Sequence, residues 1–197
     1  MSRSRITTRG PSQSVTTPPR FLGVLRHRNF ALFWFSLVFS NTGTWMQLTV
    51  VGWLVFDMTN SPAWLGVVGA ARAFPMIALP FFGGVIADRM DRRTLLWITQ
   101  ISQALVSILL TALVATGAAT VWNISALTLI AGIAHAFDQP TRQAIVPALV
   151  PRQDLRKAIA LHSVVFTGGA LLGPAIAGLL APTLGLAMVL LINTLSF

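Results

Sequence analysis

Cysteine is absent from the 197 residues, and only 10% of them carry a charge. The absence of cysteine excludes disulfides and thiol-bound metals, so the redox compartment cannot be inferred. With 54% hydrophobic residues and a mean hydropathy of +0.73, the chain has too little polar surface to cover a water-soluble globule of this size. The composition therefore predicts an integral membrane protein.

Six long apolar stretches are separated by short polar breaks. They cover residues 30–56, 62–87, 94–116, 121–140, 157–181 and 184–197. Each of the first five reaches the ~20 residues that an α-helix needs to cross ~30 Å of hydrocarbon. From Leu184 the sixth supplies about 14 residues, or ~21 Å of helix, which predicts a chain that is truncated within its sixth helix. We expect an all-α membrane bundle over residues 30–197.

The net charge of +9 raises the possibility of nucleic-acid binding, but the distribution of the charge argues against it. All but Arg72 of the 14 basic residues precede the first stretch or lie in the second and fourth breaks. The other breaks contain Asp57 as their only charged residue. By the positive-inside rule this asymmetry predicts a cytoplasmic amino terminus.

The first 20 residues are rich in Arg, Ser, Thr and Pro and contain no acid. This composition predicts a disordered basic cytoplasmic tail, and it lacks the apolar region and cleavage site of a signal peptide. A transit peptide stays open as the less favoured alternative. Residues 21–29 are expected to lie along the membrane interface, with Arg26 and Arg28 toward lipid phosphates.

Two apolar stretches carry polar residues at helical spacing. They are Ser36, Ser40, Gly43, Thr44 and Gln47 in the first, and Gln100, Gln103, Ser107 and Thr111 in the third. Each set falls on one helix face, and such faces turn to a neighbouring helix or to a water-filled cavity. Two stripes favour a cavity, which makes Thr44, Gln47 and Gln103 candidate substrate contacts. Polar packing between helices is at least as good an explanation for any one of them.

Arg72 lies about ten residues into the second stretch, where insertion costs ~2.5–3.5 kcal/mol. It needs a partner, yet the acids of the chain are expected at other depths, Asp57 outside and Asp88, Asp91, Asp138 and Asp154 inside. Three partners are open for Arg72. They are an anionic group of a substrate, a carboxylate in sequence beyond this chain, and backbone carbonyls of a helix.

The run GGALLGPAIAGLL in the fifth stretch contains Gly169, Gly173, Pro174 and Gly178. Small residues four apart allow close helix approach, and proline loosens the backbone, so packing is the default interpretation. A similar Pro80, Gly83 and Gly84 pattern ends the second stretch. This weak similarity between the second and fifth stretches fits a fold in which three helices are repeated in inverted topology.

The second break reads GGVIADRMDRR and resembles the signature loop of the major facilitator superfamily. The residues that carry the resemblance are Gly84, Asp88, Arg89, Asp91, Arg92 and Arg93. The family pattern usually has a glycine at position 91, where this chain has Asp91. An acid at this position is well placed to cap the start of the third helix. Asp88 follows the second helix, whose dipole disfavours it, and therefore needs a partner such as Arg92 or a group outside this chain.

Two further segments, SNTGTWMQLTVVGWLVFDMTNSP and FDQPTRQAIVPALVPRQDLRKAIAL, resemble bacterial transporters similar to the enterobactin exporter and to drug-efflux proteins. The glycine run looks like an antiporter motif, with Ala177 in place of one glycine. The resemblance implies the amino-terminal six-helix bundle, a 3+3 inverted repeat, of a bacterial inner-membrane transporter whose carboxy-terminal bundle is missing.

The implied function is proton-coupled export of drugs or siderophore-like small molecules by alternating access. Asp88 and Arg89 would contact the second bundle and stabilise the outward-facing state. Asp138 would pair with Arg92 in a charge relay that also includes Arg142. The coupling carboxylate is not identified, because every acid is expected away from the middle of the membrane.

Uptake of an anionic solute bound by Arg72 is one alternative, and a membrane assembly subunit without transport is another. A membrane enzyme ranks lowest, since no nucleophile set or phosphate-binding loop is present. His27, His135 and His162 are too scattered to predict a ligand cluster and are interpreted as packing or interfacial residues. We expect no metal, cofactor or nucleic acid.

Overall fold

The computed structural model describes residues 21–87 and 91–196, which form helices joined by short connections. In chain order they are η1 (Phe21–Arg26), α1 (Arg28–Thr59), α2 (Pro62–Ala87), α3 (Arg92–Ala115), α4 (Val121–Leu149), η2 (Arg152–Asp154), α5 (Leu155–Leu184) and α6 (Leu186–Thr194). The predicted all-α fold is confirmed. The predictions for residues 1–20, Asp88 and Arg89 lie outside the described residues.

Local sequence explains the sharp turn between α1 and α2. Asn60 follows α1 with φ 48°, in the left-handed region that asparagine adopts more readily than most residues. Pro62 then opens α2 at the first helical position, where its missing amide costs nothing and its fixed φ suits the helix. The sequence predicted this start of α2.

The fourth helix was predicted to end at residue 140, and this prediction is wrong, because α4 continues through Pro140 and Pro147 to Leu149. Each proline lacks the amide that would continue the helical ladder. The carbonyls left without a helical donor are those of Ala136 and Gln143, four residues before each proline. Side-chain donors bind the next carbonyl in each turn: the Thr141 hydroxyl donates to the Phe137 carbonyl at 2.7 Å, and the Arg92 guanidinium donates to the Ala144 carbonyl at 3.0 Å. These bonds lie in the turns that the prolines weaken, and membrane helices tolerate proline where neighbouring groups bind the local backbone.

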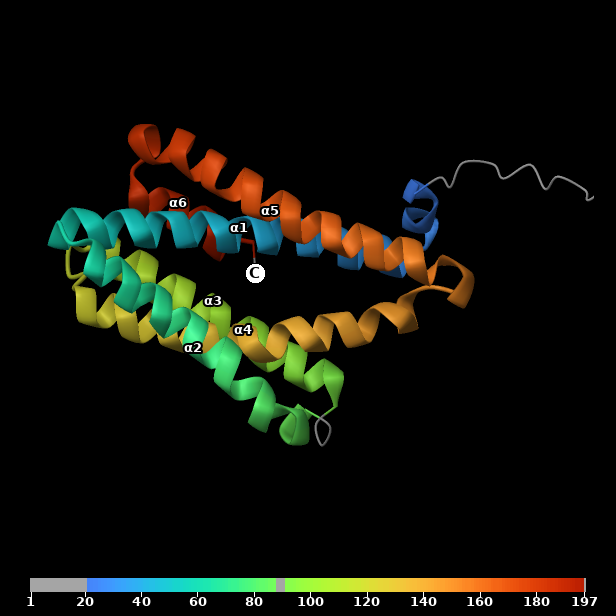
Figure 1. Ribbon diagram of the computed structural model, residues 1–197. Coiled ribbons are helices and arrows are strands. Elements are labelled where there is room, and N and C mark those ends of the chain that lie inside the picture. The colour runs from blue at the N-terminus through green and yellow to red at the C-terminus, as the bar shows by residue number, and fades with distance from the viewer. Residues whose placement is uncertain (1–20, 88–90, 197) are drawn as a thin grey trace, which may run out of the picture.

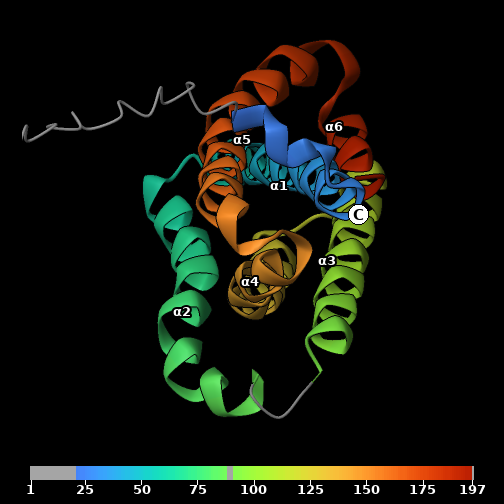
Figure 2. The ribbon, with the colours of Figure 1, turned by 90° about the vertical axis from the view of Figure 1, so that its right-hand side faces the viewer.

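The helices pack as two related halves. α1 packs extensively on α5 as α2 does on α4, and the contact of α3 with α4 corresponds to that of α6 with α1. Exchanging α1 to α3 with α4 to α6 converts each of these contacts into its counterpart, which is the pattern of a three-helix repeat. Figure 2 shows α1 and α4 between α2 and α5 on one side and α3 and α6 on the other.

Two glycines let the corresponding pairs approach closely. A Cβ at Gly132 of α4 would lie 2.6 Å from the Arg72 carbonyl oxygen of α2. A Cβ at Gly173 of α5 would lie 2.9 Å from the Thr42 carbonyl oxygen of α1. Small residues at these crossings bring backbones into contact, as membrane helix packing requires.

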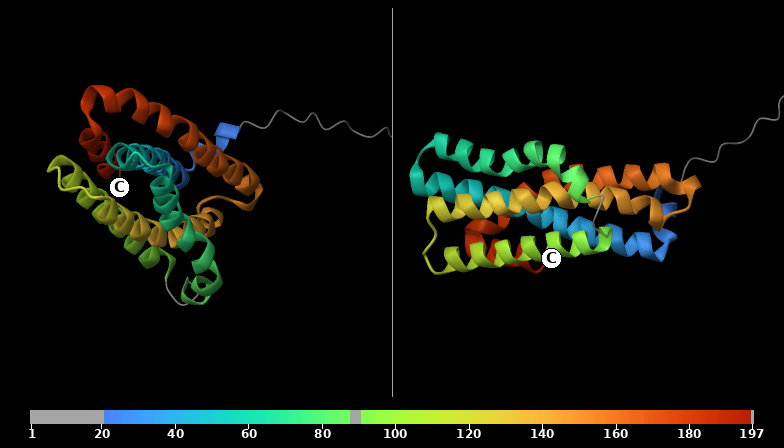
Figure 3. Two further views of the ribbon diagram at one scale, coloured as in Figure 1. Left: turned by 60° about the vertical axis from the view of Figure 1, so that its left-hand side comes forward. Right: turned by 90° about the horizontal axis from the view of Figure 1, so that it is seen from below.

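η1 and η2 lie at the same end of the bundle, here called the η1 end (Figures 1 and 3), where His27 Nε2 is 3.4 Å from Asp154 Oδ2. A buried apolar cluster at this end contains Val24, Phe30, Val146, Val150, Ala158 and Leu161. A larger one toward the other end includes Met46, Val50, Val55, Leu110, Ile124, Ala177 and Val189. Buried polar side chains occupy the layer between the two clusters.

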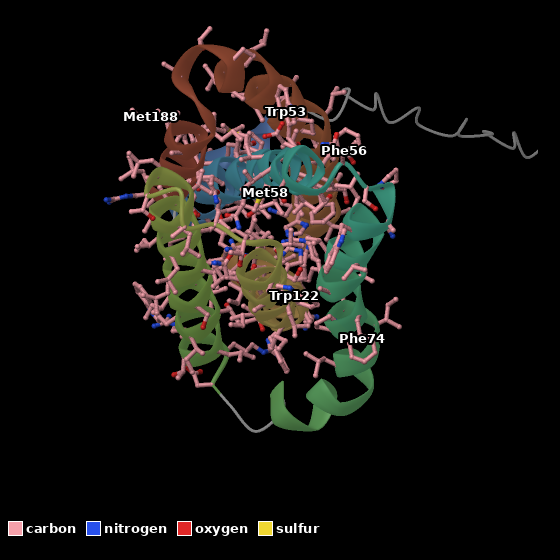
Figure 4. All side chains as sticks on the ribbon, turned by 90° about the vertical axis from the view of Figure 1, so that its left-hand side faces the viewer. Trp53, Phe56, Met58, Phe74, Trp122 and Met188 are labelled. Carbon is pink, nitrogen blue, oxygen red and sulfur yellow. The ribbon has the colours of Figure 1, made fainter. Side chains whose placement is uncertain are left out.

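Large apolar side chains cover the outside of the bundle. Phe74 is 67% exposed and Trp122 73% exposed, and Phe74 lies at the outer edge of the bundle in Figure 4. In the described part of the chain, four helices are long and apolar enough to cross a membrane: α2, α3, α4 and the segment Arg152–Leu184 that contains α5. α1 has 32 residues but carries the predicted polar stripe. An outside of this kind suits lipid rather than water.

Candidate functional site

A polar pocket opens between the two apolar clusters, and α1, α3, α4 and α5 contribute to its wall. We call it the Asp138 pocket. Its lining residues are Leu37, Ser40, Asn41, Thr44, Gln103, His135, Asp138, Gln139, Arg142, His162, Val165 and Phe166. Thr44 and Gln103, two of the predicted substrate contacts, belong to it, and so does the predicted Asp138 and Arg142 pair.

Asp138 is the centre of a buried hydrogen-bond network. Its Oδ1 accepts from the Thr99 hydroxyl at 3.0 Å and from the Gln100 amide at 2.9 Å. Its Oδ2 accepts from Arg142 Nε at 2.5 Å, one helical turn away on α4. Because the residue is only 4% exposed, these three donors replace the water that an ionised carboxylate would otherwise require.

The predicted position and partner of Asp138 are corrected by this geometry. It was expected at the inner end of the fourth helix, but α4 extends eleven residues beyond it. The predicted pair with Arg92 is also wrong, since Arg92 donates to the Ala144 carbonyl instead. The longer α4 therefore places a carboxylate inside the bundle, where the sequence predicted none.

Two histidines and a glutamine complete the polar wall. His135 is 9% exposed and Gln103 7% exposed, whereas His162 is partly buried. His135 Nδ1 and His162 Nε2 are buried without a hydrogen-bond partner in the described ranges. Within these same ranges no three His or acidic side chains gather closely enough to hold a metal ion.

A polar mouth adjoins the Asp138 pocket between α4 and α5. Its lining residues are Gln139, Gln143, His162, Ser163, Phe166 and Thr167, and three of them also line the pocket. Gln143, Ser163 and Thr167 are exposed on a surface that is otherwise largely apolar. On a membrane helix, exposed polar residues mark a face turned toward water or protein rather than lipid.

Arg72 is half-buried on α2 and lies outside the pocket lining. Its backbone contacts Gly132, which places it about one turn of α4 from His135. The structure thus brings Arg72 near the pocket without pairing it with a carboxylate among the described residues.

The remaining stripe residues mainly hold α6 in place. The Asn193 amide of α6 donates to Gln47 of α1 and to the Ser107 hydroxyl of α3, the latter at 3.1 Å. The Thr194 hydroxyl lies 2.9 Å from that of Ser107 and 3.3 Å from that of Thr111. Gln47 was predicted as a substrate contact, but its described partner is a helix neighbour, as the packing alternative expected.

The signature-loop residues in the described ranges have separate structural roles. Asp91 caps α3 by accepting from the Thr94 amide at 3.4 Å, so the predicted cap is confirmed. Arg92 binds the α4 backbone, and Arg93 is exposed. Gly84 lies within α2.

The glycine run divides into two parts. Gly169 and Gly173 are buried against α1, where an added Cβ would collide with Asn41 and Trp45 respectively. At Gly178 an added Cβ would meet nothing within 4 Å. The packing interpretation is confirmed for the first two glycines, while an antiporter role for the run stays a prediction.

His135 and His162 are the pocket residues that the sequence reasoning missed. A signal for His135 was present, because His135, Asp138, Gln139 and Arg142 follow the spacing of one helix face. The predicted stretch ends at residue 140, which divides this face and leaves Arg142 outside it. His162 had no comparable signal, since its partners in the pocket come from other helices.

A six-helix bundle with an apolar outside and a buried polar pocket defines a membrane-transporter type of architecture. The family model described as "transmembrane secretion effector" matches residues 21–197. The chain therefore belongs to this family within the major facilitator superfamily, and the predicted resemblance is confirmed. It is a multi-pass membrane protein.

Curated relatives agree with this assignment. The chain is 35% identical over 153 residues to the staphyloferrin A transporter of Staphylococcus aureus, covering 74% of this chain and 38% of the relative. It is 32% identical over 148 residues to the multidrug resistance protein MdtG of Escherichia coli, covering 75% and 33%. An uncharacterised transporter of this type, YfiS of Bacillus subtilis, is 24% identical over 163 residues, covering 82% and 38%. The matched segments thus span little more than a third of these relatives, and no solved structure matches the chain.

Proposed function

We propose that this chain is the amino-terminal bundle of a proton-coupled exporter of drugs or siderophore-like small molecules. The observation that carries the proposal is the Asp138 pocket, a charged and hydrogen-bonded site enclosed between apolar clusters in a membrane bundle. Intramembrane ionisable residues usually serve substrate or ion pathways. The relatives named as a staphyloferrin A transporter and a multidrug resistance protein suggest the substrate class.

Asp138 supplies the carboxylate for proton coupling in this proposal. Its ionised form is balanced by Arg142, so protonation would remove the charge that holds the Arg142 side chain in place. Release of Arg142 would then alter the wall that the substrate contacts. The coupling is thus a competition between proton and Arg142 for one carboxylate.

Alternating access in this proposal requires a second bundle that faces α1, α2, α4 and α5. The η1 end faces the cytoplasm, and the loop from Gly84 to Arg93 meets the second bundle there. The Arg92 bond to the Ala144 carbonyl supports a mechanical link, because it ties the start of α3 to the η1 end of α4. Movement of the loop would thereby reach the helix that carries Asp138.

The test uses the full-length product of the gene in proteoliposomes under an imposed proton gradient. A panel of lipophilic dyes and carboxylate-bearing siderophores should accumulate only while the gradient lasts, and an ionophore that collapses it should stop accumulation. Asp138→Asn should retain substrate exchange between equal proton concentrations but lose gradient-driven accumulation. Failure of the wild-type protein to move any compound would overturn export, and accumulation that survives the ionophore would overturn proton coupling.

Uptake of an anionic solute is the second candidate. Arg142 and the nearby Arg72 favour it, because Asp138, which pairs with Arg142, is the one acid among the described residues that lines the pocket. Counterflow of labelled anions in oriented vesicles separates uptake from export by direction. Unchanged transport in an Arg72→Ala variant would show that Arg72 is not part of the substrate site, whether the protein exports or imports its substrate. Absence of any transport, together with stable association with another membrane protein, would instead support an assembly subunit.

A further inference from the structure

Two imidazoles from different helices enter the Asp138 pocket with unsatisfied nitrogens. His135 Nδ1 on α4 and His162 Nε2 on α5 are buried and lack partners in the described part of the protein. An unpaired buried polar atom costs about 1–3 kcal/mol, and the large majority of buried polar atoms are paired. Because both residues line the same pocket, a group bound there is the nearest candidate partner for the two nitrogens.

The carboxylate of the pocket is already occupied, whereas the guanidinium group beside it has donors left over. The two oxygens of Asp138 accept from Thr99, Gln100 and Arg142. Arg142 uses Nε in this pair, and its two terminal guanidinium nitrogens have no partner in residues 21–87 and 91–196. The amide of Gln103, a buried residue, has none there either. A ligand rich in acceptor atoms matches this set better than a cation does.

The charge balance around the pocket also favours an anion. Asp138 faces Arg142 directly, and Arg72 lies about one turn of α4 beyond His135. No second carboxylate lines the pocket among the described residues. Two guanidinium groups and one carboxylate in a layer of low dielectric would be stabilised by one further negative charge.

The shape of the site limits how the anion is attached. The Asp138 pocket is narrow, whereas the adjoining mouth between α4 and α5 is wider and contains the ring of Phe166. The pocket offers only about 20 Å³, so a small charged head can enter it only as lining side chains shift, and an apolar or bulky remainder would lie in the mouth. A planar carboxylate suits the fork of Arg142, since guanidinium and carboxylate form paired hydrogen bonds.

We propose that the Asp138 pocket binds a carboxylate of the transported molecule. Arg142 provides the charge, and Gln103, His135 and His162 donate hydrogen bonds to the carboxylate oxygens. The inference rests on the proposed transport function and adds to it the chemical class of the substrate. It applies to export and to uptake, because it concerns binding and not direction.

The test measures binding without transport, using the full-length product of the gene in detergent. Phenylacetate and its neutral isostere phenylacetamide are the probes, and the shift of the thermal unfolding midpoint reports binding. Phenylacetate should raise the midpoint in a saturable manner, whereas phenylacetamide at equal concentrations should not. His162→Leu and His135→Leu should each weaken phenylacetate binding about tenfold, the loss expected for one hydrogen bond to a charged group.

Two further variants separate binding from folding. His162→Gln keeps a donor of similar reach and should recover most of the affinity. His27→Gln alters a histidine that contacts Asp154 outside the pocket and should bind phenylacetate as the wild-type protein does. The thermal unfolding midpoint measured without ligand identifies any leucine variant that fails to fold. In that case the phenylacetate affinity of His162→Gln tests the site.

Equal stabilisation by phenylacetate and phenylacetamide would overturn the proposal, and so would pocket variants that bind phenylacetate as well as His27→Gln does. The second result would mean that water alone completes the two imidazoles. Binding that depends on the pocket, combined with no gradient-driven transport, would keep the carboxylate site and reject the proposed export function.

Discussion

Arg142 Nε lies 2.5 Å from Asp138 Oδ2, and the two side chains are 8% and 5% exposed. They stand one turn apart on α4, so the helix itself holds the pair together. Two ions in such a position offset each other's desolvation only while both are present. The pair consequently controls the stability of the polar layer as well as its proposed chemistry.

Removing the charge of one partner should destabilise the bundle more than removing both. We expect Asp138→Asn to lower the free energy of unfolding in detergent by about 3–5 kcal/mol, because Arg142 is left buried without a counter-ion. The double variant Asp138→Asn with Arg142→Gln should lose less than the sum of the single variants. A double-mutant cycle from denaturant titrations measures this difference, and additive losses would show that the two side chains do not interact.

Two glycines of the same helix should respond in opposite ways to alanine. At Gly173 a Cβ would lie 2.9 Å from the Thr42 carbonyl and 3.0 Å from the Met46 amide, so Gly173→Ala should cost about 1–3 kcal/mol by overpacking. Gly178 has open space around it, and Gly178→Ala should be neutral or stabilise α5 by up to about 1 kcal/mol. Thermal unfolding of both variants checks this, and equal midpoints would contradict the α1 and α5 packing.

Asn193 should be a stability residue of α6. It is fully buried and bonds both Gln47 and Ser107. Because hydrogen bonds between membrane helices contribute about 0.6 kcal/mol each on average, Asn193→Leu should lose about 1–2 kcal/mol through these bonds and the poorer fit. Leu195→Ala, at a position that is 80% exposed, is the matched control and should change stability little.

The polar mouth between α4 and α5 should be reachable from water. These 197 residues contain no cysteine, so single substitutions introduce the one labelling site within them. Gln143→Cys and Thr167→Cys should react with a membrane-impermeant thiol reagent in vesicles, whereas Val164→Cys and Leu171→Cys on the apolar surface should not. Labelling rates report the exposure of each site, and equal rates at all four positions would refute a separate polar face.

The two acids of the signature loop should differ in function. Asp91 caps α3, so Asp91→Ala should destabilise the protein by about 1 kcal/mol, and Asp91→Ser should restore the cap. We expect Asp88→Asn to impair transport by the full-length protein more than Asp91→Asn does, because Asp88 is proposed to contact the second bundle. Transport rates of the two variants, normalised to the amount of protein in the vesicles, test this, and similar losses would reject the division of roles.

Much of the fold could be predicted from hydrophobic runs because membrane helices satisfy their own backbone and must match the bilayer in length. The predicted stretch 62–87 has the same bounds as α2, and the ends of α1, α3 and α5 lie within a few residues of the predicted ones. They failed at the end of α4, where two prolines normally stop a helix. The Arg92 side chain of α3 binds the α4 backbone in that region at Ala144, and a donor from another helix leaves no local trace in the sequence.

The candidate site was predicted only in parts for the same reason. Thr44, Gln103 and Asp138 could be identified as polar residues in apolar stretches, yet their sequence separation says nothing about which of them meet. Only the spacing of Asp138 and Arg142, one helical turn apart, indicates a contact. Gln47 has the same helical phase as Thr44, but it bonds to α6 and not to the pocket. The distinction depends on which helix covers each turn of α1.

The sequence by itself determined the membrane class, the helical architecture and the superfamily, because composition, run length and the signature loop are local properties of the chain. The tertiary structure decided that Asp138 lies inside the bundle, that Arg142 and not Arg92 is its partner, and that His135 and His162 share a pocket with it. The Asp138 and Arg142 pair lies within α4, but its burial and the approach of His162 depend on other helices, and that geometry is set by how the helices pack against one another.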